Sequence, residues 1–339
     1  MSGGMELYLH MPFCVRKCAY CDFLSFPSGA ETQRMYAKRL MKDIDVMGKR
    51  YGEIPVETIF IGGGTPSVPD SALIVEIMEH VRHAFHVADG AEISMEANPG
   101  TVTREKLTDY RKAGINRLSF GLQSANDREL KLLGRIHTWA EFLESFTLAR
   151  ECGFANLNID LMSALPGQTC ESWKETLSRV TDLDPEHISA YSLIIEEGTP
   201  FGERYGSEEG RKLLPDEDSE REMYHETKRF LKDCGYERYE ISNYAKPGRE
   251  CRHNIGYWTG VPYLGLGLGA SSYLDGCRFT VNPDMKQYLE EKPGMFVDIE
   301  KLTKKDMEEE FFYVGLRMTA GVSLSEFERR FGISAKEVY

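Results

Sequence analysis

The stretch Met11-Pro-Phe-Cys-Val-Arg-Lys-Cys-Ala-Tyr-Cys-Asp-Phe23 carries three cysteines, Cys14, Cys18 and Cys21, in the spacing C-x3-C-x2-C. Three thiolates on one short loop can hold three irons of a 4Fe–4S cube, because iron–sulfur clusters are bound by cysteine thiolates. The fourth iron would then have no protein ligand, and it would stay open to a substrate or cofactor.

Two other uses of these cysteines compete with a cluster. A structural zinc site usually needs four ligands, often as two C-x2-C pairs, and this loop has one pair with no second pair nearby. A disulfide uses cysteines two at a time, and three crowded together in a chain of intracellular appearance suit it poorly. We therefore prefer the cluster.

The composition is that of an ordinary globular protein. The chain has 339 residues, of which 41% are hydrophobic and 28% charged, and its net charge is −13. The length favours about two domains, or one barrel with an appendage. The excess of acids disfavours a nucleic-acid partner.

The sequence also bears on location. No run reaches the roughly 18 apolar residues of a membrane span, so we do not expect an integral membrane protein. The N-terminus lacks the basic and apolar parts of a secretory signal. The other cysteines show no disulfide spacing, so we expect a cytoplasmic protein; they are Cys152, Cys170, Cys234, Cys251 and Cys277.

Strand-like apolar runs alternate with helical patterns over the first 198 residues. Their separations bracket the roughly 30 residues of a β-α-β unit, and this alternation predicts a parallel sheet with helices outside it. Six such units would form an open, partial (β/α)6 barrel of the α/β class, with its chemistry on the loops after the strands. The runs begin near Leu7, Thr58, Ile93, Arg117, Leu157 and Ile188.

Two further regions follow the barrel. Near Thr199 an α+β extension begins, with a helix opened by the acidic run 215–218 and an extended segment over 236–244. From Met307 the pattern is helical, and Ser323 and Ser334 each stand three residues before a glutamate, as in a capping box. The second of these helices has no body, which suggests a truncated C-terminal domain. We therefore divide the chain into 1–198, 199–300 and 301–339.

Three glycines, Gly62, Gly63 and Gly64, follow the second expected strand in the run Ile59-Phe-Ile-Gly-Gly-Gly-Thr-Pro66. Glycines let a ligand approach backbone amides and carbonyls closely. No Lys-Ser/Thr follows, so the run is not a P-loop. A plain turn is the alternative, because glycine clusters also mark turns.

The segment Glu250-Cys-Arg-His-Asn-Ile-Gly-Tyr-Trp258 joins an imidazole, His253, to two aromatic rings and a thiol. Histidine is a common axial haem ligand, and aromatic rings offer flat apolar contact. The alternative is a structural loop with a hydrogen-bonded histidine. A second histidine group, at 80, 83 and 86 on one expected helix, is better explained as a solvated polar face than as a metal site.

The cysteine loop, read together with the Gly-Gly-Gly-Thr-Pro run, resembles the radical S-adenosylmethionine (SAM) superfamily. The resemblance implies that the methionine amine and carboxylate of SAM chelate the open iron, and that the glycine motif binds the methionine ammonium. In related enzymes a glutamate and an arginine hold the methionine end, and a glutamine and an aspartate hold the ribose. The implied SAM-binding residues are Tyr8, Tyr20, Gly62, Gly63, Gly64, Thr65, Glu96, Gln123, Arg135 and Asp160.

The H-N-x-x-Y-W run resembles a motif of the HemW family of haem chaperones, which are relatives of the oxygen-independent coproporphyrinogen oxidase. Phe23 stands where that oxidase has a fourth cysteine, which favours the chaperone. Ser271 stands where many relatives have a histidine, so no role of that histidine transfers to this chain. The implied haem-binding residues are His253, Asn254, Tyr257 and Trp258.

The resemblance implies a radical SAM haem chaperone that binds haem and delivers it to haem-dependent respiratory or membrane proteins, and a homodimer is one arrangement it allows. The alternative is a true enzyme, either an anaerobic coproporphyrinogen III dehydrogenase or a radical SAM methyltransferase. In the enzyme the cluster would reduce SAM to a 5′-deoxyadenosyl radical that abstracts hydrogen.

Overall fold

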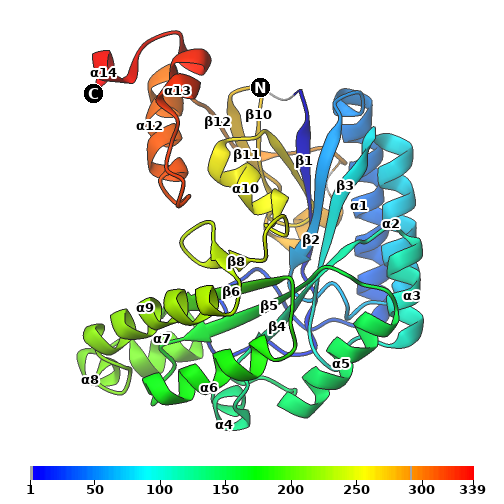
Figure 1. Ribbon diagram of the computed structural model, residues 1–339. Coiled ribbons are helices and arrows are strands. Elements are labelled where there is room, and N and C mark those ends of the chain that lie inside the picture. Colours follow the sequence, from blue (N-terminus) through cyan, green and yellow to red (C-terminus); the bar gives the residue numbers. More distant parts are fainter. Residues whose placement is uncertain (1–2, 291) are drawn as a thin grey trace.

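The computed structural model describes residues 3–290 and 292–339 (Figure 1). Its first part is a run of parallel strands, and all six positions predicted from the sequence fall in them. Each strand pairs with the next in parallel. The strands are β1 (Met5–Met11), β2 (Val56–Gly63), β3 (Val87–Ala97), β4 (Arg117–Gln123), β5 (Leu157–Ser163) and β6 (His187–Ser192).

Helices connect these strands and cover the outside of the sheet, as the alternation predicts (Figure 1). Glycines with positive φ, Gly114 and Gly153, follow the ends of α3 and α5, as expected for residues that terminate a helix. The helices are α1 (Ala30–Tyr51), α2 (Ser71–Ala84), α3 (Arg104–Lys112), α4 (Asp127–Leu132), α5 (Trp139–Glu151) and α6 (Cys170–Thr181).

Helix α1 illustrates why these segments are helical. Tyr36, Leu40, Ile44 and Met47 recur every three or four residues and are buried against the sheet, which is the stripe of an amphipathic helix. Burial of one such aliphatic side chain contributes about 1.5–3 kcal/mol. Gly52 ends the helix, and its amide donates to the Gly48 carbonyl.

The remaining elements extend the same sheet at both edges. In the described residues the order is β12-β11-β10-β9-β1-β2-β3-β4-β5-β6-β8-β7, so the sheet is open and not a closed barrel. The added elements are α7 (Pro200–Tyr205), α8 (Glu208–Arg211), α9 (Glu217–Asp233), β7 (Glu237–Arg238), β8 (Asn243–Ala245), α10 (Arg252–Thr259), β9 (Tyr263–Leu266), β10 (Ser271–Leu274), β11 (Cys277–Thr280), α11 (Met285–Glu290) and β12 (Val297–Lys301).

Two expectations for this middle region need correction. The extended segment over 236–244 is a short hairpin, because β7 and β8 pair antiparallel. The stretch around His253 does not lie apart from the barrel: it forms α10, which contacts β2. The division at 198 and 300 stays a prediction. One sheet continues across both boundaries.

The two faces of the parallel strands differ in polarity. Leu7, Ile59 and Ile93 stand opposite one another in register and are buried in the main hydrophobic core with the helices. On the other face Glu6 stands opposite Thr58, and Thr58 opposite Glu92. Because side chains alternate along a strand, the polar residues line the inside of the curved sheet.

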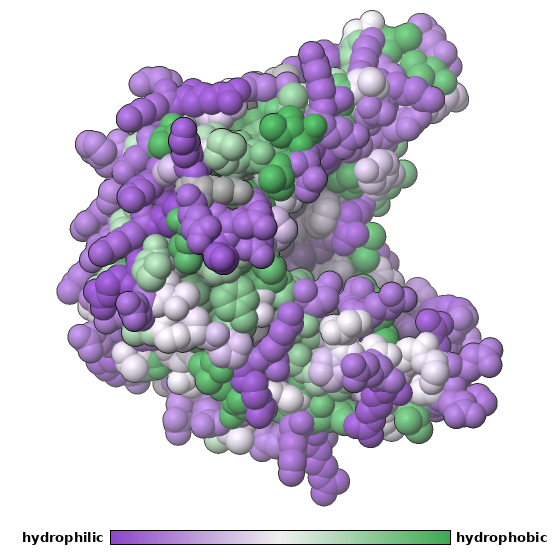
Figure 2. All heavy atoms as spheres, turned by 180° about the vertical axis from the view of Figure 1, so that it is seen from behind, coloured by the Kyte–Doolittle hydropathy of each residue, from purple (hydrophilic) through white to green (hydrophobic). Residues whose placement is uncertain are grey.

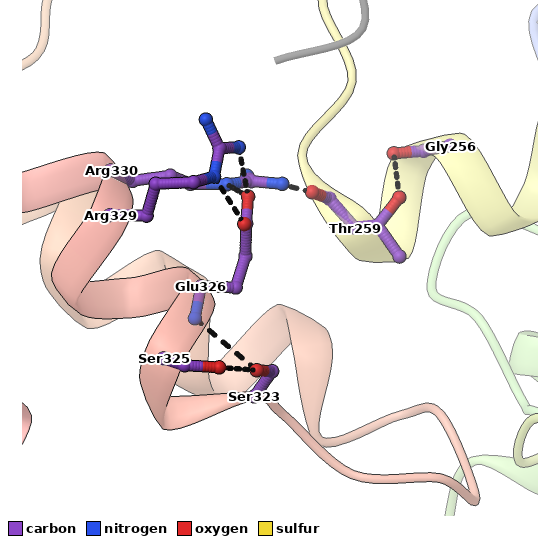
Figure 3. Close-up of polar contacts among 7 residues, drawn as sticks. All are labelled: Gly256, Thr259, Ser323, Ser325, Glu326, Arg329 and Arg330. Carbon is purple, nitrogen blue, oxygen red and sulfur yellow. Dashed lines mark hydrogen bonds and ion pairs between the residues drawn. The ribbon is translucent and has the colours of Figure 1, made fainter.

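The C-terminal region is helical, with α12 (Lys304–Gly315), α13 (Leu324–Phe331) and α14 (Ala335–Val338), and Figure 1 shows it away from the barrel helices. Ser323 caps α13 by accepting from the Glu326 amide. Glu326 does not complete the predicted box, because its carboxylate pairs with Arg329 and Arg330 (Figure 3). Ser334 makes no side-chain cap, so that prediction is wrong.

Among the described residues, no helix combines the length and the apolar character needed to cross a membrane.

Candidate functional site

The cysteine loop follows β1 directly and is tied to the barrel by its backbone. The Cys14 amide donates to the Phe26 carbonyl at 3.1 Å, and the Ala19 amide donates to the Leu133 carbonyl at 3.0 Å. Cys14, Cys18 and Cys21 are half-buried, and none of them forms a disulfide. Burial raises the pKa of the Cys21 thiol. Three free thiols are thus presented on an anchored loop.

The glycine run packs against the start of this loop. The Gly64 amide donates to the Met11 carbonyl at 2.9 Å, and the Thr65 amide donates to the Phe13 carbonyl at 2.7 Å. Gly63 has a φ of 111°, and a Cβ there would lie 2.3 Å from the His10 ring. Only glycine fits this position, so the run is a required close approach and not an ordinary exposed turn.

A chain of polar contacts joins two of the cysteines through residues that follow β2, β3 and α4. Thr65 Oγ1 lies 3.5 Å from Cys14 Sγ and accepts a hydrogen bond from Asn98 Nδ2 at 2.7 Å. Arg135 Nη2 donates to Asn98 Oδ1 at 2.5 Å, and Arg135 Nη1 lies 3.5 Å from Cys18 Sγ. Cys18, Thr65, Asn98 and Arg135 line one pocket.

Two half-buried carboxyl groups, Glu96 and Asp160, lie near this pocket. Burial raises the pKa of Glu96 to about 8; the nearby Asp160 adds to the shift, and a hydrogen bond of 3.0 Å from the Gly63 amide opposes it. Burial also raises the pKa of Asp160, although Ser119 and Asn158 donate to its carboxyl group. Such raised pKa values are typical of acids that await a cationic partner.

Of the other predicted SAM residues, Gln123 stands at a strand end, Tyr8 lies within β1 and Tyr20 lies in the cysteine loop. Gln123 ends β4 with a φ of 75°, and its Oε1 accepts from the Tyr191 hydroxyl at 3.0 Å. The Tyr8 hydroxyl lies 3.0 Å from His10 Nδ1. Tyr20 packs near Phe201, with ring centroids 6.4 Å apart.

Sequence reasoning missed two residues of this site, Asn98 and Tyr191. Asn98 stands two positions after Glu96, so the period of two along β3 was a signal that could have identified it. Tyr191 carried no such signal, because it reaches Gln123 only through the pairing of β4, β5 and β6.

The residues fit the group that the cysteine spacing implies. Among residues 3–290 and 292–339, no set of three or more His, Cys, Asp or Glu is close enough to hold a single metal ion. In a cluster each thiolate binds a different iron, so the sulfurs do not have to converge.

His253, the histidine of the H-N-x-x-Y-W segment, is buried, with 1% exposure. Its Nδ1 lies 2.7 Å from Thr58 Oγ1, and its Nε2 lies 3.0 Å from the Tyr257 hydroxyl. The ring stacks on Phe60 with centroids 5.3 Å apart. Burial, aided by Arg117, lowers the pKa of His253 to about 3, so the imidazole is neutral.

Helix α10 is held in the sheet interior at its first turn. Glu92 accepts hydrogen bonds from the amides of Arg252 and His253 at 3.2 and 3.3 Å. A carboxylate at this end complements the helix dipole. Cys251 is fully buried beside Glu92, and burial raises its pKa to about 12, which makes it a poor ligand in this state.

The C-terminal region covers the other end of α10. Arg330 Nη1 donates to the Thr259 carbonyl at 2.9 Å (Figure 3). The Arg317 guanidinium lies 4.3 Å from the Trp258 ring centroid. Tyr257, Trp258 and Asn254 are half-buried on α10. Seen from behind, the molecule is hollowed between the C-terminal region and the α7–α9 region (Figure 2).

Two minor expectations concern the histidines at 80, 83 and 86 and the position of Ser271. The expectation that all three share one helix is wrong for His86, because α2 ends at Ala84. His80 Nδ1 lies 2.9 Å from the half-buried Asp45 carboxylate, and His83 is exposed, so this helix face is solvated. At the position where many relatives have a histidine, this chain has Ser271. Its neighbour Ser272 donates a hydrogen bond to the backbone of β9.

Comparisons with known proteins agree with this arrangement. Residues 8–180 match the family model of the Radical SAM superfamily, and residues 302–339 match the HemN C-terminal domain. The heme chaperone HemW of Bacillus subtilis is 37% identical over 331 residues, which cover 96% of this chain and 87% of that protein. The Escherichia coli HemW is 41% identical over 267 residues, covering 78% of this chain and 69% of that protein.

A comparison with solved structures finds the coproporphyrinogen III oxidase HemN from Escherichia coli, described as a radical SAM enzyme. It superposes with a TM-score of 0.84 at 25% identity, over 97% of this chain and 79% of that chain. The superfamily implies a 4Fe–4S cluster and SAM.

The first prediction concerns the cluster. Anaerobically reconstituted protein should contain about four irons and four sulfides per chain, and replacing Cys14, Cys18 or Cys21 by Ala should abolish both, because each removes a thiolate ligand. Iron and sulfide analysis measures this. Cys152→Ala and Cys234→Ala are the controls and should retain the cluster. Stable zinc without iron after anaerobic purification would contradict the assignment.

The second prediction concerns Arg135. Arg135→Ala removes the charge that joins Asn98 to Cys18, so SAM binding should weaken by roughly 1.5–3 kcal/mol, the range for a charge-assisted hydrogen bond. SAM titration of the reduced cluster, followed by EPR, gives the affinity. The exposed Arg128→Ala is the matched control. Equal affinities in the two variants would rule out the role of Arg135.

The third prediction uses the raised pKa of Glu96. The folded state keeps this proton between pH 4.5 and about 8 while the unfolded state releases it, so the free energy of unfolding falls as pH rises through that window. Glu96→Gln lacks this dependence. Without SAM, its Tm should exceed that of the wild type by an amount that grows from pH 5 to pH 8.5.

Thermal unfolding across that pH range measures the difference, with the exposed Glu105→Gln as control. A constant difference between Glu96→Gln and the wild type would show that Glu96 is ionised throughout. The same variant should bind SAM more weakly, because a neutral amide attracts a cation less than a carboxylate does.

Proposed function

This chain belongs to the HemW family of the radical SAM superfamily, and from that premise we propose that it is a haem chaperone that binds haem and delivers it to haem-dependent respiratory or membrane proteins. The single observation that carries the proposal is the similarity to HemW over nearly the whole chain, which includes α10 and its H-N-x-x-Y-W segment. The proposed location is the cytoplasm, supported by eight cysteines that are all free.

The proposed cofactors are a 4Fe–4S cluster on Cys14, Cys18 and Cys21, and SAM in the adjoining pocket. When bound, the cluster supplies one-electron chemistry to SAM. The protein residues supply the binding. Arg135 and Asn98 brace the cysteine loop, while Glu96 and Asp160 are half-buried acids with raised pKa values, whose ionised forms a cationic ligand would favour.

The haem is the carried ligand, and His253, Asn254, Tyr257 and Trp258 are its proposed contacts. In the conformation described, both ring nitrogens of His253 are engaged and the ring is buried. Haem binding therefore requires the Tyr257 hydroxyl to leave Nε2. The C-terminal region also contacts α10 through Arg317 and Arg330.

Porphyrinogen oxidation is the second candidate function, and one observation favours it: the superposition on the coproporphyrinogen III oxidase HemN. Phe23 stands at the position of the extra cysteine in the oxidase, which argues against this function. Incubation with coproporphyrinogen III, SAM and a reductant without oxygen separates the two functions. Formation of protoporphyrinogen would make the enzyme the better assignment.

The fourth prediction tests the chaperone. Haem added to the protein should give a Soret band even without the cluster, and His253→Ala should weaken or reshape that band while leaving SAM binding intact. The matched control is His187→Ala. His187 is also fully buried, with its ring nitrogens 2.6 Å from Asn158 Oδ1 and 2.8 Å from the Tyr239 hydroxyl.

Both variants lose a buried, hydrogen-bonded imidazole. The free energy of unfolding should therefore fall by a similar amount in each, about 1–3 kcal/mol for the buried groups left without a hydrogen-bond partner. Only His253→Ala should change haem binding. Cys251→Ala combined with His253→Ala excludes thiolate as a substitute ligand. Haem binding that is unchanged in this double variant would mean that the proposed site is wrong.

A further inference from the structure

The two ring nitrogens of His253 have partners of different kinds. Nδ1 faces the sheet, where Thr58 Oγ1 lies at 2.7 Å and Glu6 Oε2 at 3.9 Å. Nε2 faces only the Tyr257 hydroxyl, four residues further along the same helix. Thr58 and Glu6 are 2% exposed, whereas Tyr257 is half-buried at the edge of the motif. One nitrogen is fixed by the sheet, and the other is covered by a movable side chain.

The Nδ1 partners are held rigidly. Glu6 and Thr58 stand opposite each other across the β1–β2 pairing. Gly256 of α10 lies so close to Glu6 that a Cβ on Gly256 would be 1.9 Å from Glu6 Oε1. With Phe60 stacked on the ring at 5.3 Å, His253 cannot exchange its two edges without moving α10.

The carboxyl oxygen Oε2 of Glu6 gives a second, separate indication of a ligand at His253. It is buried and has no hydrogen-bond partner among the described residues, although it is directed at the Nδ1 edge of His253. Burial raises the pKa of Glu6 to about 9, so the group is a protonated carboxyl at neutral pH, and leaving one of its oxygens buried without a partner is costly. Such a cost is expected where a group serves a function that the resting structure does not complete.

The chemistry of imidazole connects these facts. A histidine that binds iron does so through a nitrogen with a free lone pair, so its proton must lie on the other nitrogen. Metal-binding histidines typically donate that N–H to a carboxylate or another acceptor, which fixes the tautomer and raises the basicity of the ligating nitrogen. Thr58 Oγ1, 2.7 Å from Nδ1, is placed to accept that proton, and Glu6, whose Oε2 lies 3.9 Å from Nδ1, interacts with the Thr58 hydroxyl.

We propose that Thr58 and Glu6 are positioning residues that hold the proton of His253 on Nδ1, so that Nε2 is the nitrogen that binds haem iron once the Tyr257 hydroxyl moves away. This inference rests on the proposed haem-binding function and adds which nitrogen binds, what orients it and what covers it. Neither positioning residue would touch haem.

The experiment uses the full chain loaded with ferrous haem. Three variants each change one partner of the ring: Thr58→Val, Glu6→Gln and Tyr257→Phe. The matched control is Thr227→Val, because Thr227 is also buried and accepts a hydrogen bond, from Trp173 Nε1 at 2.8 Å, but belongs to α9. The readouts are haem affinity, the iron–histidine stretching frequency in resonance Raman spectra, and the haem midpoint potential.

Thr58→Val and Glu6→Gln should lower the stretching frequency and raise the midpoint potential, because a weaker acceptor at Nδ1 leaves Nε2 a poorer electron donor. Their haem affinity should fall by about 10-fold or more, the range seen when partners of a metal-binding histidine are removed. Tyr257→Phe should bind haem more tightly by a few-fold, because one hydrogen bond no longer competes. Thr227→Val should leave all three readouts unchanged.

The outcomes separate this inference from the proposed function. If the wild type gives no Soret band, the haem-chaperone function fails and the inference fails with it. If His253→Ala loses the band but Thr58→Val and Glu6→Gln match Thr227→Val in frequency and potential, the function stands and the positioning roles are overturned. If haem binds His253→Ala as it binds the wild type, His253 is not the ligand and the inference is again overturned.

A folding defect in one variant does not remove the test. Thr58→Val exchanges one hydroxyl for a methyl group of similar shape, so it decides the question if Glu6→Gln does not fold.

Discussion

The polar inner face of the β1–β6 sheet is the constraint on which the rest of this structure depends. Parallel sheets are usually apolar on both faces, because helices cover both. Here the outer face is apolar and packs on helices, while the inner face carries Glu6, Glu92 and Arg117 in buried positions and Asp160 in a half-buried one. Buried charges without partners are expensive, so the inside of the sheet must be filled by matching polar groups.

The two ends of the strands meet this constraint differently. Toward their N-terminal ends the chain supplies the partners itself: α10 places its first amides on Glu92 and its imidazole beside Thr58 and Glu6. Toward the C-terminal ends, Glu96 and Asp160 are half-buried, no ion pair joins either of them to a cation among residues 3–290 and 292–339, and their pKa values are raised. One end is closed by the fold, and the other is suited to a ligand.

Glycines allow the close packing seen at both ends of the parallel strands. Gly63 passes His10, and Gly256 passes Glu6, at distances where a Cβ would collide. The first contact brings the end of β2 against the cysteine loop, and the second lets α10 enter the sheet deeply enough for His253 to reach Thr58. Side chains larger than hydrogen at these positions would push apart elements distant in sequence.

The sequence by itself determined the six strand positions, the helices between them, the cysteine loop and most of the residues beside it, because these depend on local periodicity, spacing and motif. Tertiary structure alone decided the rest. In the folded chain the segment 236–244 forms a hairpin, the side chain of Ser334 does not cap a helix, and Tyr191 contacts Gln123. Tertiary structure also placed His253 inside the sheet, where a residue 195 positions away, Thr58, is its nearest polar partner. No local pattern encodes such pairings, because they arise from burial of the polar inner face and the close approach of distant backbone at glycine.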